Sequence, residues 1–225
     1  MVPTPEQVRL LSAACERFRG VEAPMGYPNG LALCVIDSIQ STGVTYSSVE
    51  NVIGRYCDFR RELGRDPYTD GAHDLIATFE DVGGSAAWAG RIGNRNKTST
   101  HAGAPLKAVA VRLAAQAMID GSVVTAQDLR DAAVDTARLQ QIRNSWQKVP
   151  GQRSGVTWHC VQMLAGIPGV KPDRMIIRFV ADSLGMPHKD VTAQFAWEAV
   201  HSAAEALDMS PRDLDHGIWQ WQRRH

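Results

Sequence analysis

Apolar residues recur at helical spacing along most of the chain. In residues 46–63, for example, Val49, Val52 and Tyr56 fall on one side of a helix. The same spacing predicts helices over 5–18, 72–79, 106–118, 126–134, 137–147, 156–164, 174–184, 191–207 and 212–221, with one more turn at 85–89. The run Leu31–Gln40 is apolar on nearly every side, which is typical of a buried helix. No stretch alternates as a half-buried strand does, so the sequence predicts an all-α protein of roughly eleven helices.

One break between helices differs from the others because a second break and a lone acid come soon after it. Pro150-Gly151 ends the preceding helix, and helical spacing resumes at Val156, after Gly155. The segment 166–169 (Gly-Ile-Pro-Gly) breaks the chain again, and Asp173 then stands at the start of the next helix. A carboxylate in that position is typical of a helix N-cap, so a purely structural role for Asp173 stays open.

Length and composition are those of an ordinary globular protein. The 225 residues are 44% apolar and 21% charged, enough for one sizeable core or two smaller lobes. No stretch is apolar enough to cross a bilayer, and the N-terminus lacks the pattern of a signal peptide. We therefore expect a cytoplasmic protein, nucleoid-associated if bacterial, with no membrane partner. The oligomeric state stays open, with a monomer expected.

Neither a metal nor any other cofactor is expected. The four cysteines are far apart and lie in apolar helical contexts, as core thiols do: Cys15, Cys34, Cys57 and Cys160. His159, His188 and His216 have no second ligand at metal spacing.

Charge is segregated along the chain although the formal net charge is zero. From Arg138 to Arg178 there are seven Lys or Arg residues against one acid, Asp173, whereas from Asp190 to Asp215 there are six acids against one base. A one-faced nucleic-acid binder needs such segregation, although a solvated helical face also explains part of it. The loop 90–100 is likewise polar, basic and free of acids, and either a phosphate contact or a plain connection fits it.

The break at 149–155 and the acid after it resemble a motif of the helix-hairpin-helix DNA glycosylases, the superfamily of endonuclease III. Their hairpin reads Leu-Pro-Gly-Val-Gly, and a catalytic Asp comes one helix later, five residues before an Arg. Val149-Pro150-Gly151 is similar to that hairpin, while Asp173 and Arg178 match the Asp and the Arg. Two shorter patches, Gln40-Ser41-Thr42 and Leu106-Lys107-Ala108, resemble the family's Gln-x-Thr and Ser-Lys-Ala.

The resemblance implies a two-lobed, all-α, glycosylase-like fold with a helix-hairpin-helix motif. Residues 45–170 would form a central helical bundle, and residues 1–44 with 171–225 the second lobe, with double-stranded DNA bound across the cleft between them. Asp173 would be the catalytic residue. The DNA contacts would be Gly151, Gln152, Arg153, Ser154, Gly155, Lys171 and Arg174.

Three further residues are candidates for the base pocket or for filling the gap left by a flipped base: Gln40, Thr42 and Trp158. Core packing explains Trp158 equally well, and a capped helix end explains Gln40 and Thr42. The chain departs from the family at two hairpin positions. The second hairpin Gly is Arg153, and the lysine that forms an imine in bifunctional members is Gly155.

These features predict a monofunctional glycosylase, in which Asp173 stabilises the sugar cation and orients water. Two alternatives stay open: a DNA-binding protein of the same fold without catalysis, and an all-α interaction module. The sequence does not identify the base that is removed.

Overall fold

The computed structural model describes residues 2–224; Met1 and His225, at the ends of the predicted second lobe, lie outside this range. The all-α prediction is confirmed. Within the described range the chain forms twelve α-helices and two short 3₁₀ segments, and it has no strand, only an isolated bridge between Lys97 and Leu106. No helix of this range is long and apolar enough to cross a membrane.

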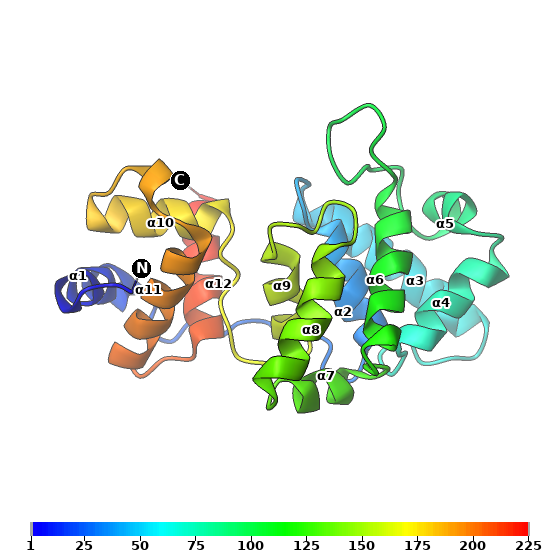
Figure 1. Ribbon diagram of the computed structural model, residues 1–225, viewed down its shortest axis with the longest axis horizontal. Coiled ribbons are helices and arrows are strands. Elements are labelled where there is room, and N and C mark those ends of the chain that lie inside the picture. Colours follow the sequence, from blue (N-terminus) through cyan, green and yellow to red (C-terminus); the bar gives the residue numbers. More distant parts are fainter. Residues whose placement is uncertain (1, 225) are drawn as a thin grey trace. The chain divides into compact units, whose positions relative to one another are not determined.

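The chain divides into two compact units, each with its own apolar core. The large unit, Met25–Ile167, contains eight helices (Figure 1): α2 (Leu31–Gln40), α3 (Tyr46–Glu62), α4 (Ala72–Asp81), α5 (Ser85–Arg91), α6 (Lys107–Asp120), α7 (Ala126–Ala132), α8 (Thr136–Gln147) and α9 (Val156–Leu164). The small unit, Met1–Pro24 with Pro168–His225, contains α1 (Pro5–Cys15), η1 (Glu16–Phe18), α10 (Arg174–Leu184), η2 (His188–Asp190), α11 (Ala193–Ala206) and α12 (Pro211–Gln222).

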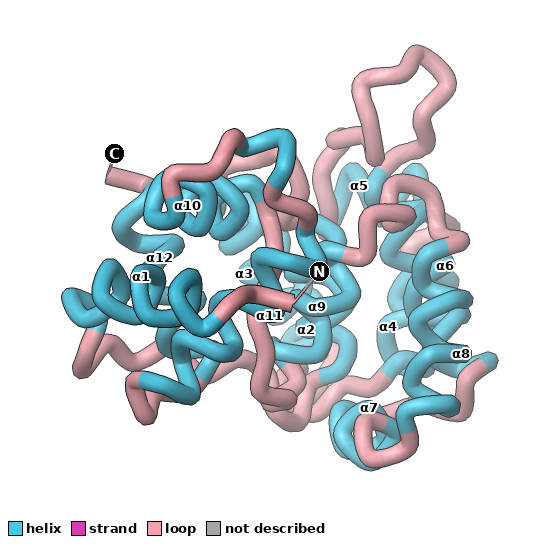
Figure 2. Tube along the Cα trace, turned by 60° about the vertical axis from the view of Figure 1, so that its left-hand side comes forward, coloured by secondary structure: helices cyan, strands magenta, loops and turns pink. Residues whose placement is uncertain are grey.

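Helix α2 is the centre of the large unit. All ten of its residues are buried, because α3, α4, α6 and α9 pack around it. Its all-round apolar sequence is what such a position requires. The other helices present one apolar face to this core, and the longest loop, between α5 and α6, projects away from the helices (Figure 2).

The boundaries of the units differ from those predicted at 44/45 and 170/171. Residues 25–44 belong with the large unit, because α2 lies in its core and the Tyr27 N–H donates to the Leu164 carbonyl at 2.7 Å. Gly26 packs directly on the Leu164 main chain, where a side chain would have no room. At the other boundary, Val170 is fully buried in the core of the small unit.

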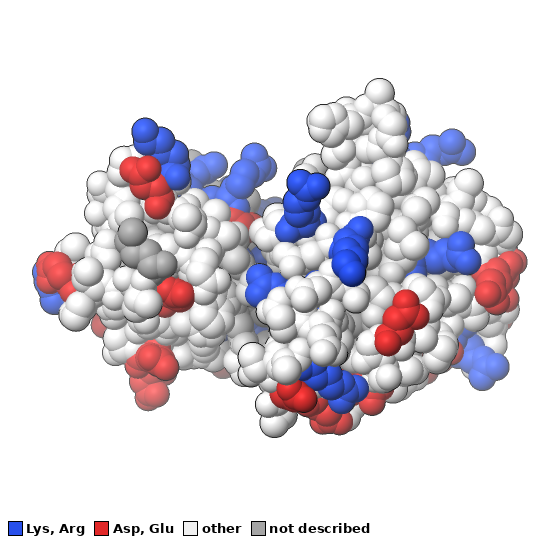
Figure 3. All heavy atoms as spheres, in the orientation of Figure 1, with Lys and Arg blue, Asp and Glu red and all other residues white. Residues whose placement is uncertain are grey.

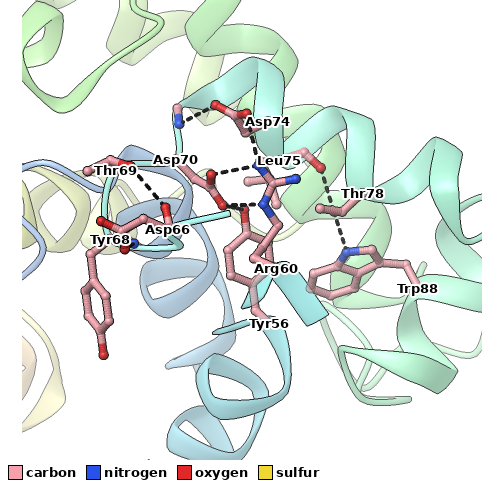
Figure 4. A network of polar contacts seen from close by, with 11 residues as sticks. Tyr56, Arg60, Asp66, Tyr68, Thr69, Asp70, Asp74, Leu75, Thr78 and Trp88 are labelled. Atoms are coloured by element: carbon pink, nitrogen blue, oxygen red, sulfur yellow. Dashed lines mark hydrogen bonds and ion pairs between the residues drawn. The ribbon is translucent and has the colours of Figure 1, made fainter. Parts of the chain in front are cut away.

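A buried ion pair joins α3 to the turn before α4 (Figure 4). The Arg60 guanidinium donates to both carboxylate oxygens of Asp70, at 2.6 and 2.8 Å, and the Tyr56 hydroxyl donates to the same carboxylate at 2.8 Å. Arg60 also reaches Asp74, which caps the start of α4 through the Gly71 N–H. Because both Arg60 and Asp70 are nearly fully buried, each depends on the other for its partner.

Candidate nucleic-acid interface and carboxylate site

Residues 149–155, here called the hairpin, connect α8 to α9 through two consecutive turns. The Gln152 N–H donates to the Val149 carbonyl at 3.0 Å, and the Gly155 N–H donates to the Gln152 carbonyl at 3.1 Å. Gly151 and Gly155 have φ values of +83° and +77°, which glycine adopts without strain. The predicted break at Pro150-Gly151 and the restart at Val156 are thus confirmed.

A chain of buried hydrogen bonds holds the hairpin from inside. The Trp146 indole N–H donates to the Thr157 hydroxyl at 3.0 Å, and that hydroxyl donates to Gln152 Oε1 at 2.6 Å. Gln152 Nε2 then donates to the Pro150 carbonyl at 3.0 Å. The Gln152 side chain is only 2% exposed. Gln152 was one of the DNA contacts predicted from the sequence. In the structure its side chain supports the hairpin from inside and does not lie on the surface.

The outer side of the hairpin is basic and polar. Arg153 and Ser154 are exposed, and the Arg153 carbonyl accepts a bond from Gln147 Nε2 at 3.1 Å. The chain from 136 to 172 has no acidic residue, and it carries Arg143 and Lys148 close to the hairpin. On the face drawn in Figure 3, Lys and Arg side chains of the large unit lie over α8 and α9, with Asp and Glu side chains lower down, toward α7.

The polar loop before α6, most of which projects away from the helices, contacts the hairpin at Thr98. A Cβ atom on Gly151 would be 2.9 Å from Thr98 Cβ, so the two main chains meet there closely. The loop returns on itself, since the Thr98 N–H donates to the Pro105 carbonyl at 2.9 Å and the Lys107 N–H to the Asn96 carbonyl at 2.8 Å. Residues 82–119 are also free of acids. Two acid-free segments, distant in sequence, therefore adjoin at Gly151.

The end of α2 is buried and is tied to α6 by Lys107. Lys107 Nζ donates to the carbonyls of Gln40 and Thr42, at 2.8 and 2.6 Å. Burial lowers the pKa of Lys107 to about 8. The Thr42 hydroxyl donates to the Ile39 carbonyl at 3.2 Å, as in a capped helix end. Gln40 is fully buried, and neither polar atom of its side chain has a partner among the described residues.

Trp158 also belongs to the core. It is 2% exposed, and its ring centroid lies 5.9 Å from that of Trp146. The three residues predicted for a base pocket are therefore buried or half-buried: Gln40, Thr42 and Trp158. A nearby acid that the sequence reasoning missed is Asp37, which is 3% exposed and accepts bonds from the hydroxyls of Tyr27 and Tyr46 at 3.1 and 3.5 Å.

In the small unit, Asp173 caps the start of α10. Its Oδ1 accepts the N–H of Met175 at 2.8 Å and of Ile176 at 3.3 Å, so the predicted N-cap is confirmed. Lys171 is half-buried, while Arg174 is exposed on the first turn of α10. The carboxylate is thus held in one orientation, with two basic residues beside it in the chain.

A second carboxylate, from α12, lies at the same loop. Asp215 is 8% exposed, and its Oδ1 accepts the Lys171 N–H at 2.8 Å. Burial raises the pKa of Asp215 to about 7, and the negative charge of Asp173 acts in the same direction. The sequence reasoning missed Asp215. Its position one helical turn before Ile218, on the apolar face of α12, was the available indication.

No group of three metal-binding side chains occurs among residues 2–224. The four cysteines are buried free thiols, and burial raises the pKa of Cys15 to about 12.

Comparison with known proteins gives a family but no function. Residues 9–223 match the model of the family described as "Domain of unknown function (DUF8548)", and the chain belongs to this family. The match spans both units, including the hairpin, Asp173 and Asp215. No curated protein and no solved structure matches the chain.

Proposed function

We propose that the protein is a monofunctional DNA N-glycosylase with a divergent helix-hairpin-helix fold, in which the hairpin contacts phosphate and Asp173 is the catalytic carboxylate. The observation that carries the proposal is the order of three features along the chain. Helices α8 and α9 form a pair, the glycine-containing hairpin joins them, and Asp173 is fixed at the start of the next helix, α10. The resemblance to the endonuclease III superfamily rests on the same residues.

The hairpin has the chemistry of a phosphate contact. Gly151 and Gly155 supply the positive φ angles of the two turns, α9 begins directly after them, and Arg153 adds a positive charge on the outer side. The buried bonds through Gln152 fix this shape before any ligand binds. Preorganisation of this kind lowers the entropy cost of binding.

Asp173 has the chemistry of a carboxylate that stabilises a sugar cation. Both N-cap bonds go to Oδ1, and we assign Oδ2 to the reaction. As the base leaves with the electron pair of the N-glycosidic bond, positive charge develops on the sugar, where Oδ2 stabilises it. Oδ2 also orients the water, whose oxygen bonds to the anomeric carbon and whose proton passes to the departing base, so that the products are the free base and an abasic sugar.

A strand-cleaving lyase reaction needs an amine that attacks the sugar. Position 155, where bifunctional members of the superfamily have lysine, is glycine here. Lys107 is 2% exposed, and its amine is bound to two carbonyls. These features support hydrolysis by water alone.

The proposal is tested by incubating the protein with oligonucleotides that carry damaged and modified bases, and then adding alkali to reveal abasic sites. We expect excision without nicking before alkali, and no protein–DNA adduct on treatment with borohydride. Asp173→Asn should abolish excision while DNA binding persists, because the lost interaction acts mainly in the transition state. Full activity of Asp173→Asn, or a trapped adduct, would overturn the assignment.

One observation favours a second candidate, a DNA-binding protein without catalysis. The N-cap bonds of Asp173 give that residue a structural role that needs no reaction. Binding that depends on Arg153, with no excision of any base across the panel, would favour this candidate. Absence of DNA binding would favour the interaction module instead.

A further inference from the structure

Asp215 is a carboxylate placed in an apolar core. It lies on α12 between Leu214 and Ile218, one turn further on, both of which are fully buried. A carboxylate is costly in such a place unless it has partners. Its Oδ1 accepts the main-chain N–H of Lys171, 44 residues away in sequence. The structure therefore retains a group that packing alone would disfavour.

That bond braces the loop that carries Asp173. Lys171 is held by Asp215, Pro172 is buried and has a fixed φ, and Asp173 is held by its N-cap bonds. The Asp173 N–H also donates to the Lys171 carbonyl at 2.7 Å, which closes a tight turn. Each of three consecutive residues is thus fixed, and Asp215 fixes the first of them.

Asp215 and Asp173 also interact through charge. Helices α10 and α11 and the segment η1 pack on α12, and Asp173 and Lys171, in the loop before α10, are the charged groups that act on Asp215. Burial, then the charge of Asp173, raises the pKa of Asp215 to about 7, while Lys171 opposes this through its main-chain N–H and its charge. Asp215 therefore changes its charge close to neutral pH.

We propose that Asp215 is a positioning residue for Asp173, which holds the Lys171–Asp173 loop and, when ionised, strengthens the stabilisation of the sugar cation. The proposal rests on the proposed glycosylase function. An ionised carboxylate is a stronger acceptor for the Lys171 N–H than a neutral one. Its charge also adds to the negative potential at Asp173, where the cation develops. Excision should accordingly become faster as pH rises through the ionisation of Asp215.

The test is single-turnover excision between pH 5.5 and 8.5 by the parent protein, Asp215→Asn, Asp215→Leu and a control, Asp182→Asn. Asn keeps the oxygen that accepts the Lys171 N–H but cannot ionise. The control removes an exposed carboxylate of α10, which pairs with His188 at 2.7 Å. We use the base that the parent excises best in the oligonucleotide panel.

We expect Asp215→Asn to match the parent at pH 5.5 and to be on the order of tenfold slower at pH 8.5, as for the loss of one nearby charge. Asp215→Leu, which loses the acceptor as well as the charge, should lower the single-turnover rate constant on the order of 100-fold at pH 5.5 and on the order of 1000-fold at pH 8.5, with DNA affinity little changed. Asp182→Asn should behave like the parent.

Identical pH profiles for the parent and Asp215→Asn would overturn the charge role. A near-parental single-turnover rate constant for Asp215→Leu at pH 5.5 would overturn the bracing role, while the glycosylase assignment would stand. If the parent excises no base, the proposed function fails, and the role of Asp215 fails with it.

Discussion

Replacing Thr157 with valine tests whether the buried chain of hydrogen bonds gives the hairpin its shape. Valine has nearly the same volume as threonine but no hydroxyl. The change leaves two buried groups without partners, the Trp146 indole N–H and Gln152 Oε1. Each such group costs about 1–3 kcal/mol, so the free energy of unfolding should fall by about 2–6 kcal/mol. That loss is large beside the total stability of roughly 5–15 kcal/mol that is usual for a domain.

The large unit offers a matched control in Thr78→Val. There the Trp88 indole N–H donates to the Thr78 hydroxyl at 3.0 Å, away from the hairpin (Figure 4). Thr78 donates onward to the Leu75 carbonyl, a main-chain group of its own helix. The control therefore leaves one buried side-chain group unpaired, with an expected cost of about 1–3 kcal/mol.

The free energy of unfolding is measured by urea denaturation. The affinity of the folded protein for duplex DNA is measured at a series of salt concentrations. Thr157→Val should lower the affinity, and loss of one phosphate contact should reduce the log–log salt slope by about 0.9. Thr78→Val should bind DNA like the parent. If Thr157→Val loses no more stability than the control, the chain of hydrogen bonds does not hold the hairpin. Unchanged binding despite lost stability would refute the hairpin as a DNA contact.

Three further outcomes are expected. The pKa of Asp215 is raised from 3.8 to about 7 on folding. Its contribution to the free energy of unfolding is therefore fully present below about pH 4 and is lost progressively as the pH rises from about 4 to about 7. Relative to Asp215→Asn, the parent should thus lose a few kcal/mol over this range in denaturation curves. Arg153→Ala should reduce the salt slope of DNA binding by about 0.9, whereas Arg65→Ala, in the loop after α3, should not. Asp70→Asn, which removes the charge that pairs with buried Arg60, should cost about 3–5 kcal/mol on urea denaturation without weakening DNA binding.

Helix positions were predictable because they depend on local spacing and capping. The run Leu31–Gln40 was expected to be a buried helix and is one, since its apolar residues leave no face for water. The capping role of Asp173 was predictable from a carboxylate at a helix start. These features need no knowledge of the remainder of the chain.

What the sequence did not predict depends on contacts between distant residues. Periodicity showed that α2 would be buried but not in which unit, since that depends on packing against α6 and α9, which lie far along the chain. Gln152 was predicted as a DNA contact, and the sequence did not indicate its burial, because its polarity does not reveal Thr157 as its buried partner. Asp215 went unnoticed because its partner is a main-chain N–H, which every residue but proline has.

The left-handed conformation of Gly155 limits how this chain can evolve. A residue with a side chain costs about 1–2 kcal/mol more at such a φ angle. A Cβ atom there would lie 3.1 Å from Gln147 Nε2 and 3.5 Å from Arg143 Nη2. If the protein is the glycosylase proposed above, a lysine at this position would bring the amine of a lyase, but it would also disturb the backbone that shapes the hairpin. A descendant that gained strand-cleaving chemistry at position 155 would therefore have to remodel its hairpin at the same time.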